Sequence, residues 1–194
     1  TTSILGYGNQ GRAHALNLRD SGISVVIGGR PDSEARQKAA DDGFETFDHD
    51  EAVRRSDLII IALPDEVHGE VWRTSLQPVV RPGQVLGVIH GFSLHHGDID
   101  PPEGVGAVLV APKGPGDLVR REYERGAGVP CLFAVRQDAT GEARERALAY
   151  ASLIGGTTAG VIETSFREET ETDLFGEQAV LCGGATELVA AGFE

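Results

Sequence analysis

The sequence feature that most constrains the fold is an alternation of short, continuously apolar segments with longer amphipathic ones. The apolar segments are rich in β-branched residues, which is typical of strands buried on both faces of a parallel sheet. They lie at residues 3–5, 25–27, 58–63, 85–89, 105–110, 131–135 and 159–162. The clearest helices are expected at residues 10–20 and 142–154, and a glycine follows each of them closely. This order predicts an α/β fold, namely a doubly wound parallel sheet of the Rossmann type.

Composition narrows the class of protein. The chain has 194 residues, of which 40% are apolar, and this is enough for one well-filled core. Its net charge of -13 opposes binding to nucleic acid or to an anionic membrane surface. The two cysteines are far apart and lack the spacing of metal ligands, which is typical of reduced thiols. No apolar run approaches the roughly 20 residues that cross a bilayer, so we expect a soluble, cytoplasmic protein.

The pattern changes after residue 162. Residues 164–194 carry no strand signal, and we interpret them as one or two helices that begin in an acidic stretch. We therefore expect a dinucleotide-binding domain over residues 1–164 and the beginning of a helical domain over residues 165–194. The sequence starts inside an expected strand, contains no methionine and stops just after residues typical of a helix end, so we expect a chain trimmed at both ends.

A glycine-rich turn joins the first expected strand to the first expected helix. In such a turn the first glycine permits a tight bend, the second lets the backbone approach phosphate, and the third lets the helix pack on the strand. Free N–H groups at the start of the helix then face the pyrophosphate of a nicotinamide cofactor. The residues are Gly6, Tyr7, Gly8, Asn9, Gln10 and Gly11.

The loop after the second strand leaves the identity of the dinucleotide open. An acidic residue there binds the ribose hydroxyl of NAD, whereas a cationic one receives the 2′-phosphate of NADP. Arg30 and Ser33 suit a phosphate, but Asp32 and Glu34 would repel it.

Chemically reactive side chains follow three later strands, at the sheet edge where open α/β proteins bind ligands. The segment 63–66 follows the first of these strands, His90 follows the second, and Lys113 lies between a proline and a glycine after the third. Farther along, Asp173 and Glu177 are four residues apart, so on a helix they face one way and could share a hard cation such as Mg²⁺. The apolar residues around this pair predict that it is partly buried.

These motifs together resemble ketol-acid reductoisomerase (acetohydroxyacid isomeroreductase) of the short-chain class, along essentially the whole chain. The most specific stretches are residues 6–22, 111–116 and 169–184. The resemblance implies a Mg²⁺-dependent alkyl shift in 2-acetolactate or 2-aceto-2-hydroxybutyrate, followed by reduction to a 2,3-dihydroxy acid in valine and isoleucine biosynthesis. It implies NADPH as hydride donor, with NADH as the alternative, and a homo-oligomer that is at least a dimer.

The same resemblance assigns roles to residues of this sequence. His90, Lys113 and Glu177 would be catalytic, and Asp173 and Glu177 would bind the metal. Gly116 would contact the cofactor through its backbone. A further cofactor-binding segment near the nicotinamide would comprise Asp65, Glu66, Val67 and His68.

The sequence departs from the family pattern in two respects. Of two serines that commonly bind the 2′-phosphate, Ser33 is present, but the other position holds Ala35. NADH therefore stays open as the alternative cofactor. Further carboxylate ligands and a serine of the family lie in a knotted helical domain beyond residue 194, so we expect an incomplete site here. Two alternatives stay open: a cofactor-binding module without turnover, and a paralogue that reduces another 2-keto acid.

Overall fold

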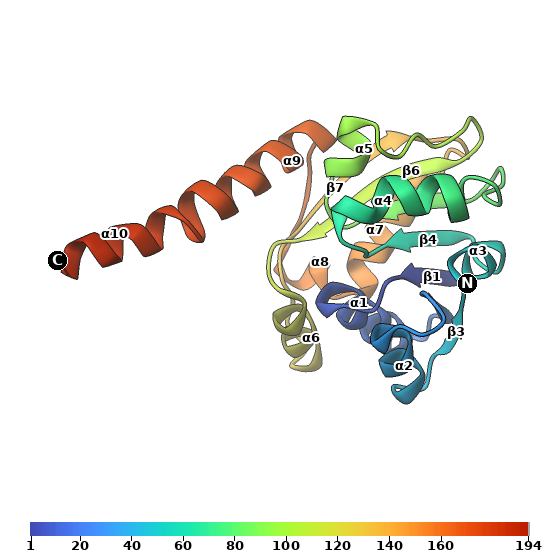
Figure 1. The fold of residues 1–194 in the computed structure, drawn as a ribbon, viewed down its shortest axis with the longest axis horizontal. Coiled ribbons are helices and arrows are strands. Elements are labelled where there is room, and N and C mark those ends of the chain that lie inside the picture. Colours follow the sequence, from blue (N-terminus) through green and yellow to red (C-terminus); the bar gives the residue numbers. More distant parts are fainter. Residues whose placement is uncertain (194) are drawn as a thin grey trace.

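The computed structural model describes residues 1–193 and contains one mixed sheet with helices on both of its faces (Figure 1). The sheet has eight strands in the order β3-β2-β1-β4-β5-β6-β7-β8. The strands are β1 (Thr2–Leu5), β2 (Val25–Gly28), β3 (Glu45–Phe47), β4 (Leu58–Ile61), β5 (Val85–Val88), β6 (Gly106–Pro112), β7 (Cys131–Gln137) and β8 (Val161–Glu163). The helices are α1 (Asn9–Asp20), α2 (Glu34–Asp41), α3 (His49–Arg54), α4 (Asp65–Val71), α5 (Phe92–His96), α6 (Gly116–Glu124), α7 (Ala143–Leu153), α8 (Gly156–Ala159), α9 (Phe166–Phe175) and α10 (Gly184–Phe193). Two π-helical turns, η1 (Trp72–Leu76) and η2 (Gly176–Leu181), continue α4 and α9.

The predicted Rossmann-type sheet is confirmed, with two differences. The short edge strand β3 is an addition to the predicted strands, and it pairs parallel with β2. Strand β7 runs antiparallel to β6, so the expectation of an entirely parallel sheet is wrong. The reason is that residues 113–130, including α6, start at the carboxyl end of β6 and return to that same end of the strand. Pro112, the last residue of β6, therefore pairs with Cys131, the first residue of β7.

The core lies on both faces of the sheet because successive side chains of a buried strand point to opposite faces. In β1, Ile4 packs in a cluster with residues of α1 and α7, while Leu5 packs on the other face with residues of α3, η1 and α5. Ile60 and Ile61 of β4 divide in the same way. Burying each of these aliphatic side chains contributes about 1.5–3 kcal/mol.

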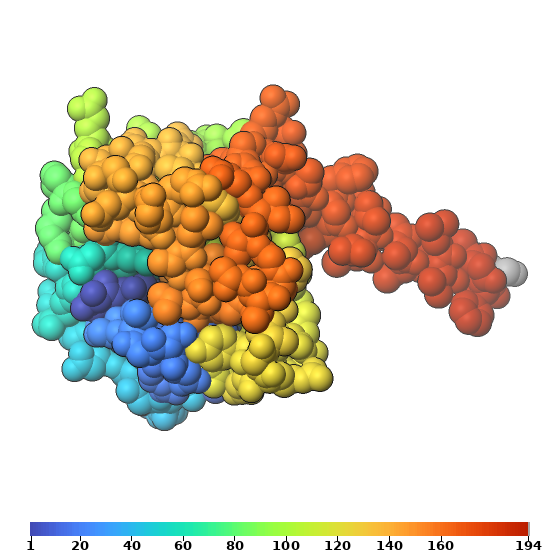
Figure 2. Space-filling view, turned by 180° about the vertical axis from the view of Figure 1, so that it is seen from behind, coloured from blue at the N-terminus to red at the C-terminus, as the bar shows by residue number. Residues whose placement is uncertain are grey.

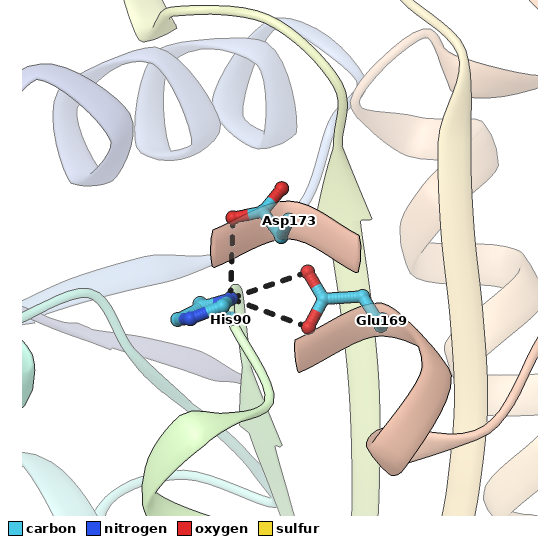
Figure 3. A group of neighbouring side chains, drawn as sticks. All are labelled: His90, Glu169 and Asp173. Atoms are coloured by element: carbon cyan, nitrogen blue, oxygen red, sulfur yellow. Dashed lines mark hydrogen bonds and ion pairs between the residues drawn. The ribbon is translucent and has the colours of Figure 1, made fainter. Parts of the chain in front are cut away.

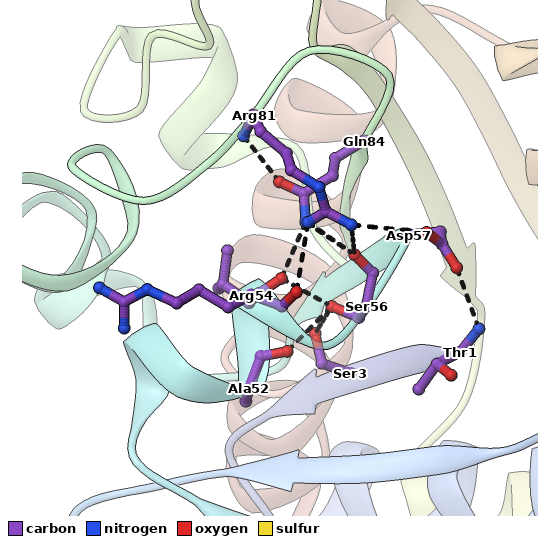
Figure 4. Close-up of polar contacts among 9 residues, drawn as sticks. Thr1, Ser3, Ala52, Arg54, Ser56, Asp57, Arg81 and Gln84 are labelled. Atoms are coloured by element: carbon purple, nitrogen blue, oxygen red, sulfur yellow. Dashed lines mark hydrogen bonds and ion pairs between the residues drawn. The ribbon is translucent and has the colours of Figure 1, made fainter.

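A buried polar network closes the amino edge of the sheet (Figure 4). Gln84, which is 1% exposed, donates from Nε2 to the carbonyl oxygens of Val53 and Ser56 and accepts the backbone N–H of Arg81 at Oε1. Ser56 donates from Oγ to Ser3 Oγ at 2.9 Å. The network satisfies backbone groups where α3 ends and β4 begins.

Helices α9 and α10, joined by η2, extend away from the sheet as a nearly continuous arm (Figures 1 and 2). The outer part of this arm exposes large apolar side chains, including Phe175, Leu188 and Phe193.

Among residues 1–193, no helix is both long and apolar enough to span a membrane. Both cysteines are free thiols, Cys131 buried and Cys182 exposed.

Candidate functional site

The glycine turn lies at the carboxyl edge of the sheet, between β1 and α1. Gly6 has a φ of +97°, and a Cβ there would lie 2.7 Å from the carbonyl oxygen of Ala62. A Cβ on Gly11 would collide with the carbonyl oxygen of Gly6, so close packing of helix on turn requires glycine at both positions. No side chain caps the start of α1, and its first turn contains no acidic residue. The N–H groups at this helix terminus are therefore suited to an anion.

The turn opens into a cleft of about 500 Å³, which we call the cofactor cleft. It is lined by the turn, by the loop after β2 and by the end of β4, the route that a dinucleotide takes across such a sheet. Of the predicted cofactor residues, it contains Gly6, Tyr7, Gly8, Asn9, Gln10, Arg30 and Ser33. The side chain of Tyr7 is 2% exposed, and its hydroxyl donates to Asp42 at 2.8 Å. Burial and this carboxylate raise the pKa of the Tyr7 hydroxyl.

Other predicted cofactor residues lie around the cleft rather than in it. Gly11 is buried beneath the turn, and Gly116 lines a smaller hollow together with Gly8 and Asn9. Along α4, Glu66 is exposed, Val67 is half-buried and His68 is buried. These assignments remain predictions.

A second cleft of about 690 Å³, the cluster cleft, lies beside the first at the same sheet edge. Gln10 lines both clefts, and its side-chain amide donates to the carbonyl oxygen of Gly114 at 2.9 Å. The predicted chemical residues that line the cluster cleft are Asp65, His90, Lys113, Asp173 and Glu177. Residues from α4, from the ends of β5 and β6, and from the α9 arm thus meet in one place.

Glu169, a residue absent from the predicted site, organises this cluster (Figure 3). Its side chain is 0% exposed and accepts hydrogen bonds from Lys113 Nζ at 2.7 Å and from the backbone N–H of Gly91 at 2.8 Å. His90 Nδ1 lies 3.3 Å from the Glu169 carboxylate and 3.4 Å from Asp173 Oδ2. Lys113 Nζ also donates to Asp173 Oδ1 at 2.7 Å. One ammonium group and one imidazole ring are therefore held between two carboxylates.

The pKa values of this cluster follow from opposing effects. Burial by itself lowers the pKa values of Lys113 and His90. The hydrogen bonds and charges of Glu169 and Asp173 outweigh burial and hold both pKa values above their ordinary range. Burial likewise favours protonated Glu169, but the bonds from His90 and Lys113 lower its pKa. The pKa of Asp65, whose Oδ2 lies 4.0 Å from His90 Nε2, is raised by burial.

The predicted partial burial of Asp173 and Glu177 is confirmed for Asp173, whose side chain is 24% exposed, and is wrong for Glu177. Glu177 is exposed, and Leu174, Phe175, Val180 and Leu181 are exposed as well. The reason is that η2 already lies beyond the sheet, where residues 1–193 supply nothing to cover it. Asp173 is partly covered because α9 still packs against the strand ends there.

Oxygen-rich clusters of this kind suit a hard divalent cation. Potential ligand atoms of His90, Glu169 and Asp173 lie within 4.8 Å of one another, and Glu177 lines the same cleft. The donor set therefore fits Mg²⁺ chemically, and the uncapped α1 terminus fits a pyrophosphate.

Comparisons with known proteins agree with this architecture. The family model described as the NADPH-binding domain of acetohydroxy acid isomeroreductase matches residues 1–160, and that of the ketol-acid reductoisomerase C-terminal domain matches residues 166–194. A solved NADH-preferring ketol-acid reductoisomerase from an uncultured archean is 45% identical, with a TM-score of 0.95 over 99% of this chain. The match covers 60% of that protein, so the present chain spans about three fifths of its length.

More distant structures share only the fold. A semialdehyde dehydrogenase NAD-binding protein from Cupriavidus necator is 19% identical, with a TM-score of 0.76 and coverage of 98% of this chain and 71% of that one. An imine reductase variant from Myxococcus stipitatus is 18% identical, with a TM-score of 0.67 and coverage of 98% and 62%.

Proposed function

Because the chain belongs to the ketol-acid reductoisomerase family, we propose that it carries the dinucleotide-binding part and one half of the catalytic site of an enzyme with that activity. The enzyme would convert 2-acetolactate or 2-aceto-2-hydroxybutyrate to a 2,3-dihydroxy acid, in the cytoplasm, for valine and isoleucine synthesis. The observation that carries this proposal is the position of the His90–Lys113–Glu169–Asp173 cluster directly beside the cofactor cleft. A hydride donor and a charged substrate would thereby meet at one sheet edge.

Asp173 and Glu177 are the proposed Mg²⁺ ligands, and the cofactor cleft is the proposed NAD(P)H site. When bound, Mg²⁺ would polarise the substrate oxygens during alkyl migration, and NAD(P)H would supply the hydride. The remaining ligands would come from residues outside this chain, in a homo-oligomer. The exposed apolar side chains of α10 support burial of the arm in that assembly.

The protein groups have distinct parts in this proposal. Lys113 is held as a cation and uses two of its three N–H groups on Glu169 and Asp173, which leaves one to bind a substrate oxygen in the cleft. His90 is oriented by carboxylates on both sides of its ring. Glu177, exposed on the cleft wall, is a candidate for proton transfer as well as for metal binding.

The test follows oxidation of NADH and NADPH by the full-length protein, with 2-acetolactate and with the already isomerised 2-keto acid, with and without Mg²⁺. We expect both substrates to be reduced only when Mg²⁺ is present. Asp173→Asn should reduce the rate by about 10²-fold or more, because it removes a charged ligand. Reduction of the 2-keto acid alone would instead indicate a paralogue. Binding of cofactor without any turnover would indicate a cofactor-binding module.

We propose further that NADH is the preferred cofactor. Ser33 Oγ is already engaged, because it donates to the Arg30 carbonyl and accepts the backbone N–H of Arg36 as the cap of α2. The Arg36 guanidinium is bound by Asp48 and Thr46. Glu34, in the first turn of α2, adds negative charge beside the cleft. Arg30 in the cofactor cleft would therefore be the main donor left for a 2′-phosphate, and Glu34 would oppose that charge.

Titration of the chain with each dinucleotide checks this preference through nucleotide fluorescence. We expect Kd for NADH to be at least about tenfold lower than Kd for NADPH, which corresponds to about 1.4 kcal/mol. Glu34→Gln should reduce the ratio of Kd for NADPH to Kd for NADH, mainly by improving NADPH binding. Glu103→Gln makes the same charge change at an exposed loop position and should leave the ratio unaltered. Equal affinity of the wild type for both dinucleotides would contradict the proposal.

A further inference from the structure

His68 joins the two strand ends on which the proposed chemistry depends. It lies on α4, is 3% exposed, and uses both ring nitrogens within the protein. Nε2 lies 2.9 Å from the carbonyl oxygen of Leu63, which follows β4. Nδ1 lies 2.6 Å from Oγ of Ser93, a fully buried residue of α5 that follows His90 by three positions. Because a carbonyl oxygen only accepts, Nε2 carries a hydrogen.

The groups that His68 joins border different clefts. Leu63 and Pro64 line the cofactor cleft, whereas Asp65 and His90 line the cluster cleft. Asp65 Oδ1 lies 3.4 Å from His68 Nδ1, and its Oδ2 faces His90 Nε2 at 4.0 Å. The His68 imidazole thus sets the distance between the turn at the end of β4 and His90, whose ring faces Glu169.

We infer that His68 is a positioning residue that fixes the cofactor-lining turn 63–65 relative to His90, and so aligns the hydride donor with the substrate. It would act through the turn rather than by a hydrogen bond of its own to the cofactor, because both ring nitrogens are used within the protein. This inference rests on the proposed function. Misplacing reacting groups by about 1 Å costs on the order of 10²-fold in rate, so a rigid link at this point has a large kinetic effect.

The test compares His68→Leu with His68→Gln in the full-length protein. Glutamine restores an N–H donor close to the Nε2 position and can satisfy the Leu63 carbonyl, whereas leucine cannot. We expect His68→Leu to slow reduction of the isomerised 2-keto acid by about 10- to 100-fold, with KM for that substrate changed less than twofold. The primary isotope effect with deuterated NADH should rise, and His68→Gln should recover most of the rate. His96→Leu, an exposed histidine change on α5, serves as the control.

A purely structural role would lower thermal stability and both partial reactions equally, leaving the isotope effect unchanged, and this result would overturn the inference. If the wild type turns over neither substrate, the proposed function fails. The inference is then judged on bound NADH. The emission maximum of bound NADH should shift in His68→Leu and return to the wild-type value in His68→Gln. Identical emission in all variants would also overturn the inference.

Discussion

Glu169→Gln is expected to reduce turnover of 2-acetolactate by about 10²–10³-fold, the size of effect seen when one preorganised electrostatic contact is removed from an active site. The substitution keeps the shape of the side chain but removes its charge. Lys113 and His90 would lose the carboxylate that lies 2.7 and 3.3 Å from their nitrogen atoms. One end of the glutamine amide is a donor, and it would face the N–H of Gly91 or the Lys113 ammonium. A buried donor without a partner costs a further 1–3 kcal/mol or so.

Glu168→Gln is the matched control for this prediction. Glu168 is the neighbouring residue on α9; it is exposed, and its carboxylate accepts a hydrogen bond from the Thr164 hydroxyl. Its substitution removes the same charge and should leave turnover within about twofold. NADH binding should be retained in both variants because the glycine turn is untouched. Equal activity of the two variants would refute the organising role of Glu169.

The pH dependence of stability provides a second measurement for Glu169. Its pKa is lowered in the folded protein, so the carboxylate stabilises the fold at pH values above the ordinary glutamate pKa of about 4.3. This contribution is lost as the pH falls through the lowered pKa. The free energy of unfolding of the wild type should therefore exceed that of Glu169→Gln at neutral pH, and the two should converge in acid. Denaturant unfolding at a series of pH values checks this.

The strands were predictable to the extent that burial imposes a pattern on the sequence. The run at residues 58–63 has no polar residue, so the central position of β4 followed directly. Strand β3 has only three residues, Glu45–Phe47, at the sheet edge, and they are exposed or half-buried. No continuous apolar run forms under those conditions. The antiparallel direction of β7 depends on where α6 packs, which is a tertiary property that no local pattern records.

The sequence predicted the positions of His90 and Lys113 at strand ends, and both line the cluster cleft, while their roles stay predictions. Glu169 was missed because it belongs to an acidic stretch that is typical of a solvated helix face. A usable signal was nevertheless present. Phe166, Glu169, Thr170 and Asp173 follow the spacing i, i+3, i+4 and i+7, so they share one face of α9. Phe166 marks that face as buried, and any carboxylate on it must therefore meet a cationic partner.

Gly91→Ala is expected to separate cofactor binding from catalysis by displacing α9. Gly91 has a φ of −77°, so alanine fits the backbone, and the effect is steric. A Cβ would lie 2.5 Å from Thr170 Oγ1, 3.0 Å from Glu169 Oε2 and 3.1 Å from the Phe166 carbonyl oxygen. Helix α9 must therefore move and weaken the hydrogen bond from the Gly91 N–H to Glu169. We expect a stability loss of about 1–3 kcal/mol and a turnover loss comparable to that of Glu169→Gln.

A double-mutant cycle with Thr170→Ala tests whether the contact with Thr170 causes the losses of stability and turnover in Gly91→Ala. Thr170 Oγ1 is buried without a hydrogen-bond partner within residues 1–193, so removing it alone should change stability little. In the Gly91→Ala background, the same change removes the closest obstructing atom and should recover part of both stability and turnover. Denaturant unfolding, NADH titration and turnover are measured on all four proteins, and NADH affinity should stay within about twofold throughout. Strictly additive effects would show that the contact between residue 91 and Thr170 does not determine the position of α9. The need for glycine at position 91 would then have another cause.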